Sequence, residues 1–336
     1  MDNRPVQLEK HPLADFYNGN KKVINTLLMV ILVFVGGELV LTFLKGAAPG
    51  TFLSTQQVFL TMRLATFVAL FGLCQMLVIC VGGGGLDLSV GYIATLSGIL
   101  GASIMDGGNG GLVPAILVAI AVGAVFGLGN GVLTAYAGLP PLVVTMAMAN
   151  IVQGIVNAYV AATPIKGQSA PLLQALAAKF TGVFPNILLV VLVALVISGV
   201  LIGKTKIGAK ILGVGANETT AYLSGVNVRR VRCIAFVVSG ILAALIGLLL
   251  VGYLGQAAKD MGSNYVMPSV VAVVVGGCSI NGGEANYLSV VLGAIVLQSL
   301  TNLFVALGWG DAGKWLGYGI ILLVMLAAYV RGKRRR

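Results

Sequence analysis

Five amide side chains inside apolar stretches are the first candidates for chemistry in this chain. Asn150, Gln153 and Asn157 are spaced three and four residues apart, which places them on one face of a helix. Gln298 and Asn302 repeat the four-residue spacing in a later apolar stretch. Amides donate and accept hydrogen bonds, so both sets suit the binding of a neutral polyhydroxy solute. They equally suit hydrogen bonds between packed helices, each contributing about 0.6–2 kcal/mol in a membrane.

Asp87 is the second candidate, because it follows a run of four glycines at the join of two apolar stretches. Glycine permits backbone dihedrals that other residues avoid, so the chain is not expected to be helical there. A carboxylate beside such a turn can cap the following helix at Ser89 and Val90. A direct functional role for Asp87 is the alternative, because ionisable groups inside membranes often mark a pathway.

The sequence offers no set of residues for catalysis or for metal binding. It contains no GxxxxGK[ST] phosphate loop, no HExxH motif and no Cys/His cluster. His11 is the only histidine, and the four cysteines fit small apolar filling residues, with no CxxC pair among them. We therefore expect a non-enzyme without a metal or cofactor of its own. Any ATP and Mg²⁺ would be bound by a separate ATPase.

The elements that carry these residues are expected to be membrane-spanning helices. Hydrophobic residues make up 58% of the chain and charged residues only 9%, against about 25% in a soluble protein. A span needs about 20 apolar residues, which predicts an all-α polytopic membrane protein of about ten helices. The ten segments are 23–44, 64–81, 88–105, 112–135, 142–162, 183–202, 233–254, 265–280, 287–308 and 315–330. Pro268, Gly276 and Gly277 interrupt one segment, so one or two spans are expected to be broken or re-entrant.

Basic residues predict the orientation, because cytoplasmic loops carry an excess of lysine and arginine. Of the 21 basic residues, 15 fall in the N-terminal segment, in the 203–232 loop or at the C-terminus, which share one side if there are ten spans. We therefore expect both termini to be cytoplasmic, with 1–22 as an N-terminal tail, 23–330 as the membrane domain and 331–336 as a basic tail. Topology and anionic lipid headgroups account for the net charge of +11 without a nucleic-acid partner.

The 203–232 loop is the largest polar region of the chain. Asn217 is a suitable N-cap for a short helix from Glu218 to Ser224, and Gly225 can end it. Glu218 also favours the positive end of that helix. A short helix held outside the membrane is what a transporter needs to receive force from a cytoplasmic motor. A surface helix without a partner is the alternative.

Four motifs follow one another in a fixed order along the chain. They are GGLDLSVG at 84–91, Asn130-Gly131 followed by LPPLVVT at 139–145, TKIG at 205–208 with GVGANE at 213–218 and AYLSGV at 221–226, and VAVVVGGCSINGG at 271–283. With them, the stretch from about 77 to 330 resembles the membrane subunit of sugar-type ABC importers, the ribose, xylose, arabinose and autoinducer-2 permease group. Asn302 also matches an asparagine of that family.

The resemblance implies a permease in the bacterial cytoplasmic (inner) membrane that imports a sugar or polyol by alternating access. It implies a second permease subunit, in a homodimer, a cytoplasmic ATPase, and a periplasmic or lipid-anchored solute-binding protein as partners. The coupling residues would be Gly213, Gly215, Asn217, Glu218, Ala221, Ser224 and Gly225. The candidate pathway residues are Asp87, Ser89, Asn130, Thr145, Asn150, Gln153, Asn157, Gln298 and Asn302.

Three alternatives stay open on the sequence. A secondary transporter coupled to ions would work without an ATPase, since sodium coupling needs only backbone carbonyls and amides. A permease for branched-chain amino acids would share the same organisation. A subunit paired with a non-identical permease would carry only part of a pathway.

Overall fold

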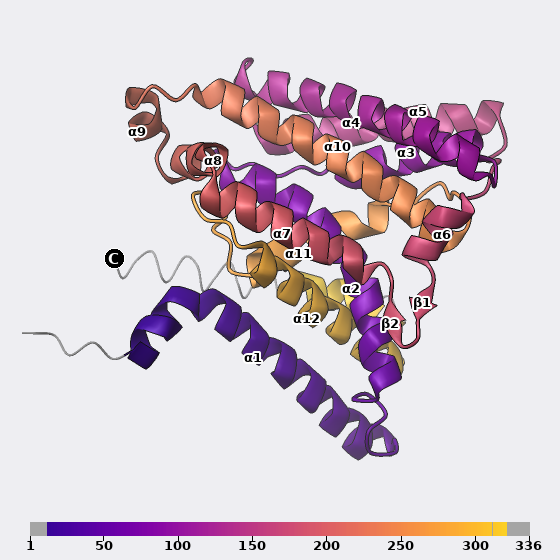
Figure 1. Cartoon of the computed structure of the whole chain (residues 1–336). Coiled ribbons are helices and arrows are strands. Elements are labelled where there is room, and N and C mark those ends of the chain that lie inside the picture. Colours follow the sequence, from indigo (N-terminus) through magenta and orange to yellow (C-terminus); the bar gives the residue numbers. More distant parts are fainter. Residues whose placement is uncertain (1–11, 311, 321–336) are drawn as a thin grey trace, which may run out of the picture.

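The computed structural model describes residues 12–310 and 312–320, and it is almost entirely helical (Figure 1). The helices are α1 (Pro12–Lys45), α2 (Thr55–Cys80), α3 (Val90–Met105), α4 (Leu112–Ala135), α5 (Pro141–Ala162), α6 (Pro171–Ala177), α7 (Leu188–Lys204), α8 (Lys206–Ala216), α9 (Glu218–Leu223), α10 (Val228–Leu254), α11 (Val266–Val275) and α12 (Tyr287–Ala306). Two 3₁₀ turns, η1 (Asn109–Gly111) and η2 (Ser263–Tyr265), precede α4 and α11. A small antiparallel hairpin joins β1 (Phe180–Thr181) to β2 (Phe184–Pro185).

Six of the described helices, α1, α2, α4, α5, α10 and α12, are long and apolar enough to cross a membrane. α7 and α8 make a seventh candidate if they are counted together, although the chain bends by 73° between them. α3 and α11 are only about 24 Å and about 15 Å long, against about 30 Å of hydrocarbon. Ten spans and cytoplasmic termini stay predictions, and most of the segment 315–330 lies outside the described residues.

Two predicted segments begin elsewhere in the structure. α2 begins at Thr55, well before residue 64, because the Ser54 side chain accepts a hydrogen bond from the Gln57 N–H and caps the helix there. α7 begins at Leu188 instead of residue 183, because the β hairpin occupies the chain up to residue 185. The segment 265–280 is interrupted, as its glycines predicted: α11 ends at Val275, and Gly277, with a φ of 76°, follows that end.

The most extensive helix packing joins α4 to α10, and it runs through glycine. Gly123, Gly127 and Gly131 lie on one face of α4 and meet the backbone of α10. A Cβ at Gly123 would lie 2.4 Å from the Gly240 carbonyl oxygen, and one at Gly127 only 2.6 Å from that of Phe236. Such distances exclude any side chain, so the two helix backbones touch, as small residues allow inside membranes.

The helix bundle has two distinct ends (Figure 1). α8, α9 and the first turns of α1 lie at one end, and α6 lies with the β hairpin at the other. The first end also contains the loop after α11, because the Lys22 ammonium pairs with the Glu284 carboxylate. Gly283 there donates its N–H to the Cys80 carbonyl oxygen at the end of α2.

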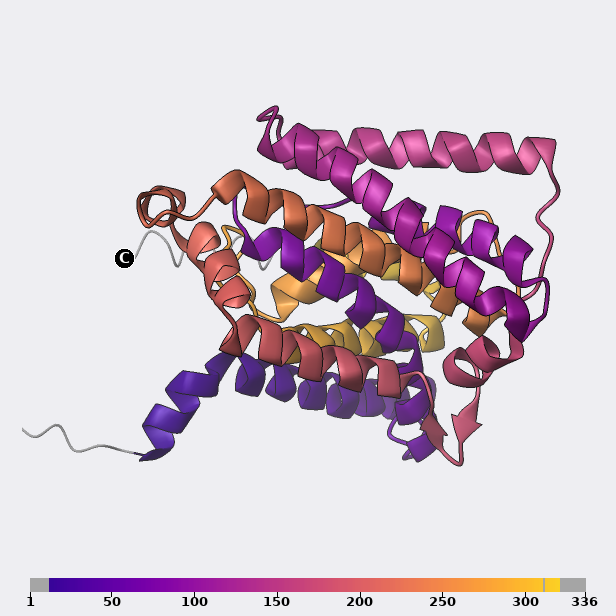
Figure 2. The same cartoon turned by 45° about the horizontal axis from the view of Figure 1, so that its top comes forward.

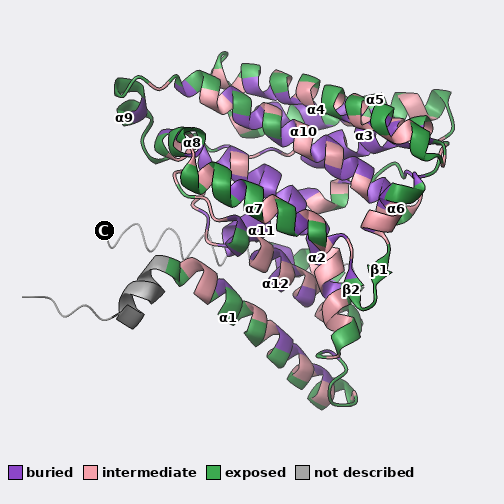
Figure 3. Cartoon of the chain, viewed as in Figure 1, coloured by how far each residue is buried: buried purple, intermediate pink, exposed green. Residues whose placement is uncertain are grey.

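Burial separates a central helix from peripheral ones (Figure 3). In α2, 83% of the most apolar window is buried inside the chain, and α3, α7, α10, α11 and α12 all contact it. In α5 the corresponding share is only 33%, and this helix packs chiefly on α3 and α4. α5 therefore offers most of its surface to lipid, to solute or to another chain.

Candidate functional site

Asp87 lies at the centre of a buried polar cluster between α2, α3 and α4. Its Oδ1 accepts hydrogen bonds from the Ser89 N–H at 3.0 Å and from the Ser89 Oγ at 2.6 Å. The Ser89 Oγ in turn accepts from the Asn130 Nδ2 of α4 at 2.8 Å. All three side chains are fully buried. The carboxylate therefore fixes Ser89, the residue before α3, but among the described residues no side chain bonds the free N–H groups in the first turn of α3, so the capping predicted at Ser89 and Val90 is limited to Ser89.

Two further side chains bind the backbone of the same turn. The Gln75 amide of α2 donates to the Asp87 carbonyl at 2.7 Å and accepts from its N–H at 3.2 Å. The Thr145 hydroxyl of α5 donates to the Leu86 carbonyl at 3.0 Å. We call Gln75, Asp87, Ser89, Asn130 and Thr145 the polar knot. It ties α2, α3, α4 and α5 to one non-helical turn.

The amide stripe of α5, which is Asn150, Gln153 and Asn157, lies outside the polar knot. Asn150 and Asn157 are exposed and Gln153 is half-buried. Asn150 donates to the Met146 carbonyl of its own helix, and Gln153 donates to the Asn157 Oδ1 at 3.4 Å. The stripe thus makes few contacts with other helices, and the side chains of Asn150 and Asn157 are accessible, whereas the Gln153 Oε1 is buried.

One contact links this stripe to the opposite wall of a small cavity. The Gln153 Nε2 donates to the Asp260 carboxylate at 3.3 Å. Asp260 lines a cavity of about 480 Å³ between the end of α10 and η2, together with Lys259 and Asn264. The cavity and the stripe together offer amides, one carboxylate and one ammonium, which can hydrogen-bond several hydroxyl groups.

The amides of α12 behave differently from those of α5. The Gln298 Nε2 donates to the Asn302 Oδ1 at 3.0 Å, and the Asn302 Nδ2 donates to the Thr61 hydroxyl of α2 at 2.8 Å. Thr61 is fully buried and also donates to the Gln57 carbonyl. This pair therefore fastens α12 to the central helix, while its role in a pathway stays a prediction.

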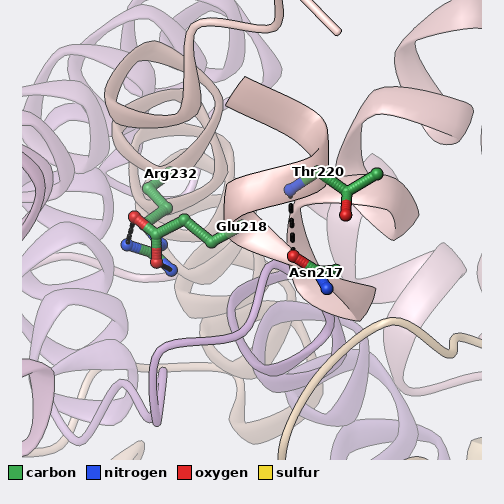
Figure 4. Close-up of polar contacts among 4 residues, drawn as sticks. All are labelled: Asn217, Glu218, Thr220 and Arg232. Carbon is green, nitrogen blue, oxygen red and sulfur yellow. Dashed lines mark hydrogen bonds and ion pairs between the residues drawn. The ribbon is translucent and has the colours of Figure 1, made fainter. Parts of the chain in front are cut away.

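The candidate coupling segment, residues 205–227, folds as two short helices at one end of the bundle. Figure 4 shows the N-cap of α9, where the Asn217 Oδ1 accepts from the Thr220 N–H at 2.9 Å. α9 runs from Glu218 to Leu223, and Gly225 follows it with a φ of 80°. The short helix, its cap and its glycine stop are therefore confirmed as the sequence predicted them.

An ion pair fixes α9 to α10 (Figure 4). The Arg232 guanidinium donates to both carboxylate oxygens of Glu218, at 3.1 and 2.8 Å. A bidentate pair of this kind fixes orientation as well as distance. A Cβ on Gly83 would lie 3.1 Å from the Arg232 Nη2, so the guanidinium also lies against the glycine run that leads to Asp87.

α8 reaches the same glycine run through close backbone contacts. A Cβ on Gly215 would lie 1.9 Å from the Cys80 carbonyl oxygen, and one on Gly82 would lie 3.1 Å from the Gly215 Cα. Residues 213–218 therefore touch the turn that connects α2 to the polar knot. Because of these contacts, a shift of α8 and α9 would displace the turn that leads to Asp87.

The structure thus divides the predicted site residues into three places. The glycine-run motif, Asn130 and Thr145 meet in the polar knot, the α5 amides face outward, and Gln298 with Asn302 binds α2. Sequence reasoning missed Gln75, Arg232 and Asp260. Gln75 was a polar residue within a predicted span, and Asp260 followed the end of one, beside Lys259. No spacing rule links Gln75 to Asp87, 12 positions further on across a non-helical turn, or Asp260 to Gln153, which lies 107 positions away.

Comparison with known proteins gives the family. Residues 57–329 match the family model described as the branched-chain amino acid transport system / permease component. The probable ABC transporter permease protein y4mJ of Sinorhizobium fredii is 32% identical over 75% of this chain and 75% of the relative. The ribose import permease protein RbsC of Bacillus subtilis is 30% identical over 72% and 75%, and the D-allose permease AlsC of Escherichia coli is 28% identical over 82% and 81%.

No solved structure matches the chain. The family model covers most of the chain, and the relatives are aligned over about three quarters of their own length. The buried glycine-run turn, the capped α9 and the apolar helices all lie within the matched residues. The chain therefore belongs to the family of multi-pass ABC transporter permeases described as the branched-chain amino acid transport system permease component.

Proposed function

We propose that this chain is the membrane subunit of an ATP-driven importer for a sugar, a pentose, hexose or related polyol. The printed names of its relatives, which include ribose, allose and fructose permeases, support a sugar over a branched-chain amino acid. The observation that carries the proposal is the α5 stripe. Asn150 and Asn157 are exposed and Gln153 bonds Asp260 of a small cavity, while the polar knot is closed.

Two copies of the chain enclose one pathway in this proposal. α5 is the helix with a broad exposed face that also carries hydrogen-bonding groups, so we place it at the interface between the copies. Amides from both subunits then face one passage. Because each amide binds a hydroxyl group weakly, the solute can enter from its binding protein and still leave on the other side.

The coupling segment receives the force of the ATPase. We place α8, α9 and both chain termini on the cytoplasmic side of the bacterial inner membrane, where the ATPase binds ATP and Mg²⁺. Movement of α9 passes through the Glu218–Arg232 pair and through Gly215 to the glycine run. That run leads to Asp87, which fixes Ser89 at the start of α3, so the motor acts on the helices that surround the pathway.

The test is ATP-driven uptake by the complete importer. The chain is purified in mild detergent from native membranes, the co-purifying ATPase and solute-binding protein are identified by mass spectrometry, and the assembly is reconstituted in liposomes. The proposal predicts sugar uptake that needs both partners and internal ATP. Uptake by the chain alone, driven by an ion gradient, would establish a secondary transporter instead.

The substrate is tested with the same assembly. The binding protein is screened against pentoses, hexoses, polyols and the branched-chain amino acids, and each bound compound is then offered for uptake. We expect a sugar or polyol to compete for uptake and the amino acids to have no effect. Uptake of leucine, isoleucine or valine would assign the chain to the amino-acid branch.

The coupling route is tested by exchanging charges. Glu218→Arg places two cations together where the ion pair was, and we expect it to lower ATP-driven uptake by roughly tenfold or more while the protein stays folded. The exchange Glu218→Arg with Arg232→Glu restores an ion pair and is expected to recover much of the uptake. Wild-type uptake in the single variant would remove the pair from the coupling route.

A further inference from the structure

A long apolar groove separates α7 from α10. Its volume is about 1040 Å³, its floor is α2, α6 closes one end and α8 with the turn at 225–227 closes the other. α7 packs on α2, α8 and α12, whereas α10 packs chiefly on α4, α3 and α2. Figure 2 shows α2 running between the two walls. The groove is therefore open to the hydrocarbon of the bilayer along its length.

The walls of the groove offer almost nothing but alkyl groups. Val193 and Ile197 of α7 are 55% and 52% exposed, and Ile234 of α10 is 57% exposed. Ser198 is the hydroxyl on these walls, and it donates to the Leu195 carbonyl of its own helix. Such a surface fits an acyl chain and not a sugar, so the groove is distinct from the proposed pathway.

One end of the groove is strongly basic. Lys210 of α8 and Arg230 of α10 both line it and are exposed. Between Leu188 and Gly255 the one acidic side chain is Glu218, and it is paired with Arg232. Within the part of the chain that the structure describes, neither Lys210 nor Arg230 forms an ion pair. Two cations therefore stand at the mouth of an apolar channel.

The length of the groove matches a membrane lipid. It follows α10 from Arg230 to Leu249, which is about 28 Å at 1.5 Å per residue, close to the ~30 Å hydrocarbon core. α10 begins at the end of the bundle that carries α8 and α9 (Figure 1), and Arg230 lies in its first turn, where a headgroup would meet water. The basic mouth and the apolar channel are thus arranged as the headgroup and acyl chain of one lipid require.

We propose that this groove binds an anionic phospholipid, with its phosphate at Lys210 and Arg230 and an acyl chain between α7 and α10. Charge complementarity selects anionic lipid over zwitterionic lipid. Gly225 and Asn227 of the coupling segment also line this end of the groove. The bound lipid therefore supports the segment that receives the ATPase, a consequence that rests on the proposed function, whereas lipid binding itself does not.

Native mass spectrometry of the full chain tests the site. The detergent-purified protein is titrated with phosphatidylglycerol and with phosphatidylcholine of the same acyl chains. The double variant Lys210→Gln with Arg230→Gln is compared with Lys204→Gln with Arg229→Gln, which removes the same charge from residues that do not line the groove. We expect the first variant to bind phosphatidylglycerol roughly tenfold more weakly than the control, and the two variants to bind phosphatidylcholine alike.

A second variant tests the acyl-chain channel without changing charge. Val238→Trp fills the groove from the α10 wall and is expected to weaken binding of both lipids, while the protein remains monodisperse. Equal phosphatidylglycerol affinity in the two double variants would overturn the proposal. Equal affinity of the wild-type chain for the two lipids would do the same. So would the finding, by cross-linking from Ile197→Cys, that a second protein chain covers the groove in the assembled importer.

Discussion

The polar knot and the α5 amide stripe contain the same kinds of side chain in very different surroundings. In the polar knot, Ser89 connects Asp87 to Asn130 through hydrogen bonds of 2.6 and 2.8 Å, and all three residues are fully buried. On the stripe, Asn150 is exposed and bonds only its own helix among the contacts found. Polar residues inside a membrane protein therefore do two jobs. Some fasten a non-helical turn into the fold, and others lie exposed on the surface of a peripheral helix, where we propose that the solute passes.

The largest difference should appear when the polar knot loses its central hydroxyl. Ser89→Ala leaves the buried Asn130 amide without its acceptor, at about 1–3 kcal/mol for an unsatisfied group, and removes one of the two donors to the Asp87 Oδ1, since the backbone N–H of residue 89 remains. We expect the melting temperature of the purified protein to fall by several degrees. Ser198→Ala is the matched control, because that hydroxyl bonds only its own helix, and it should melt almost as the wild type does. Equal melting of both variants would show that the polar knot does not hold the fold.

Substitutions on the α5 stripe should lower sugar uptake and leave stability almost unchanged. Asn150→Leu and Gln153→Leu remove amides that make few contacts between helices, so stability should change by less than about 0.5 kcal/mol. Sugar uptake by the assembled importer should fall severalfold, because the passage loses hydrogen-bonding groups. Ile151→Leu, on the same helix but beside the stripe, serves as the control. Normal uptake in both amide variants at normal protein level would place the pathway elsewhere.

Substitutions on α12 should have the smallest effect, and it should fall partly on stability and partly on uptake. Asn302→Leu loses the hydrogen bond to Thr61 of α2, and we expect about 1 kcal/mol of lost stability. Thr61→Val removes the other partner of the same bond, so its effect on stability should be similar and the double variant should add little. If Asn302→Leu lowers uptake far more than Thr61→Val does, Asn302 touches the solute as well as α2.

The sequence predicted local structure well where one segment determines it. Asn217, Glu218 and Gly225 lie within nine residues, and their roles as cap, first turn and stop follow from neighbouring backbone groups. Gly123, Gly127 and Gly131 recur at every fourth residue, a spacing typical of a close helix contact in membranes, but only the structure identifies α10 as the partner. The assignment of the chain to the membrane followed from its composition alone, with 58% hydrophobic and 9% charged residues.

The sequence could not separate the candidate site residues into the polar knot, the α5 stripe and the α12 pair, because that separation depends on partners far along the chain. Gln153 meets Asp260 across 107 positions, and Asn302 meets Thr61 across 241. Helical spacing places Asn150, Gln153 and Asn157 on one face but does not say whether another helix covers it. The boundary errors have a different, local origin: the Ser54 cap sets the start of α2, and the hairpin before α7 pairs Phe180 with Pro185.

Accessibility of the stripe to water tests the central claim most directly. The four native cysteines are all buried, so a cysteine introduced on α5 stands out against a low background. In the assembled importer, Asn150→Cys and Asn157→Cys should react quickly with a charged thiol reagent and be protected by the transported sugar, while Ile151→Cys should react slowly. Equal, slow reaction at all three positions, unaffected by sugar, would contradict a pathway along α5.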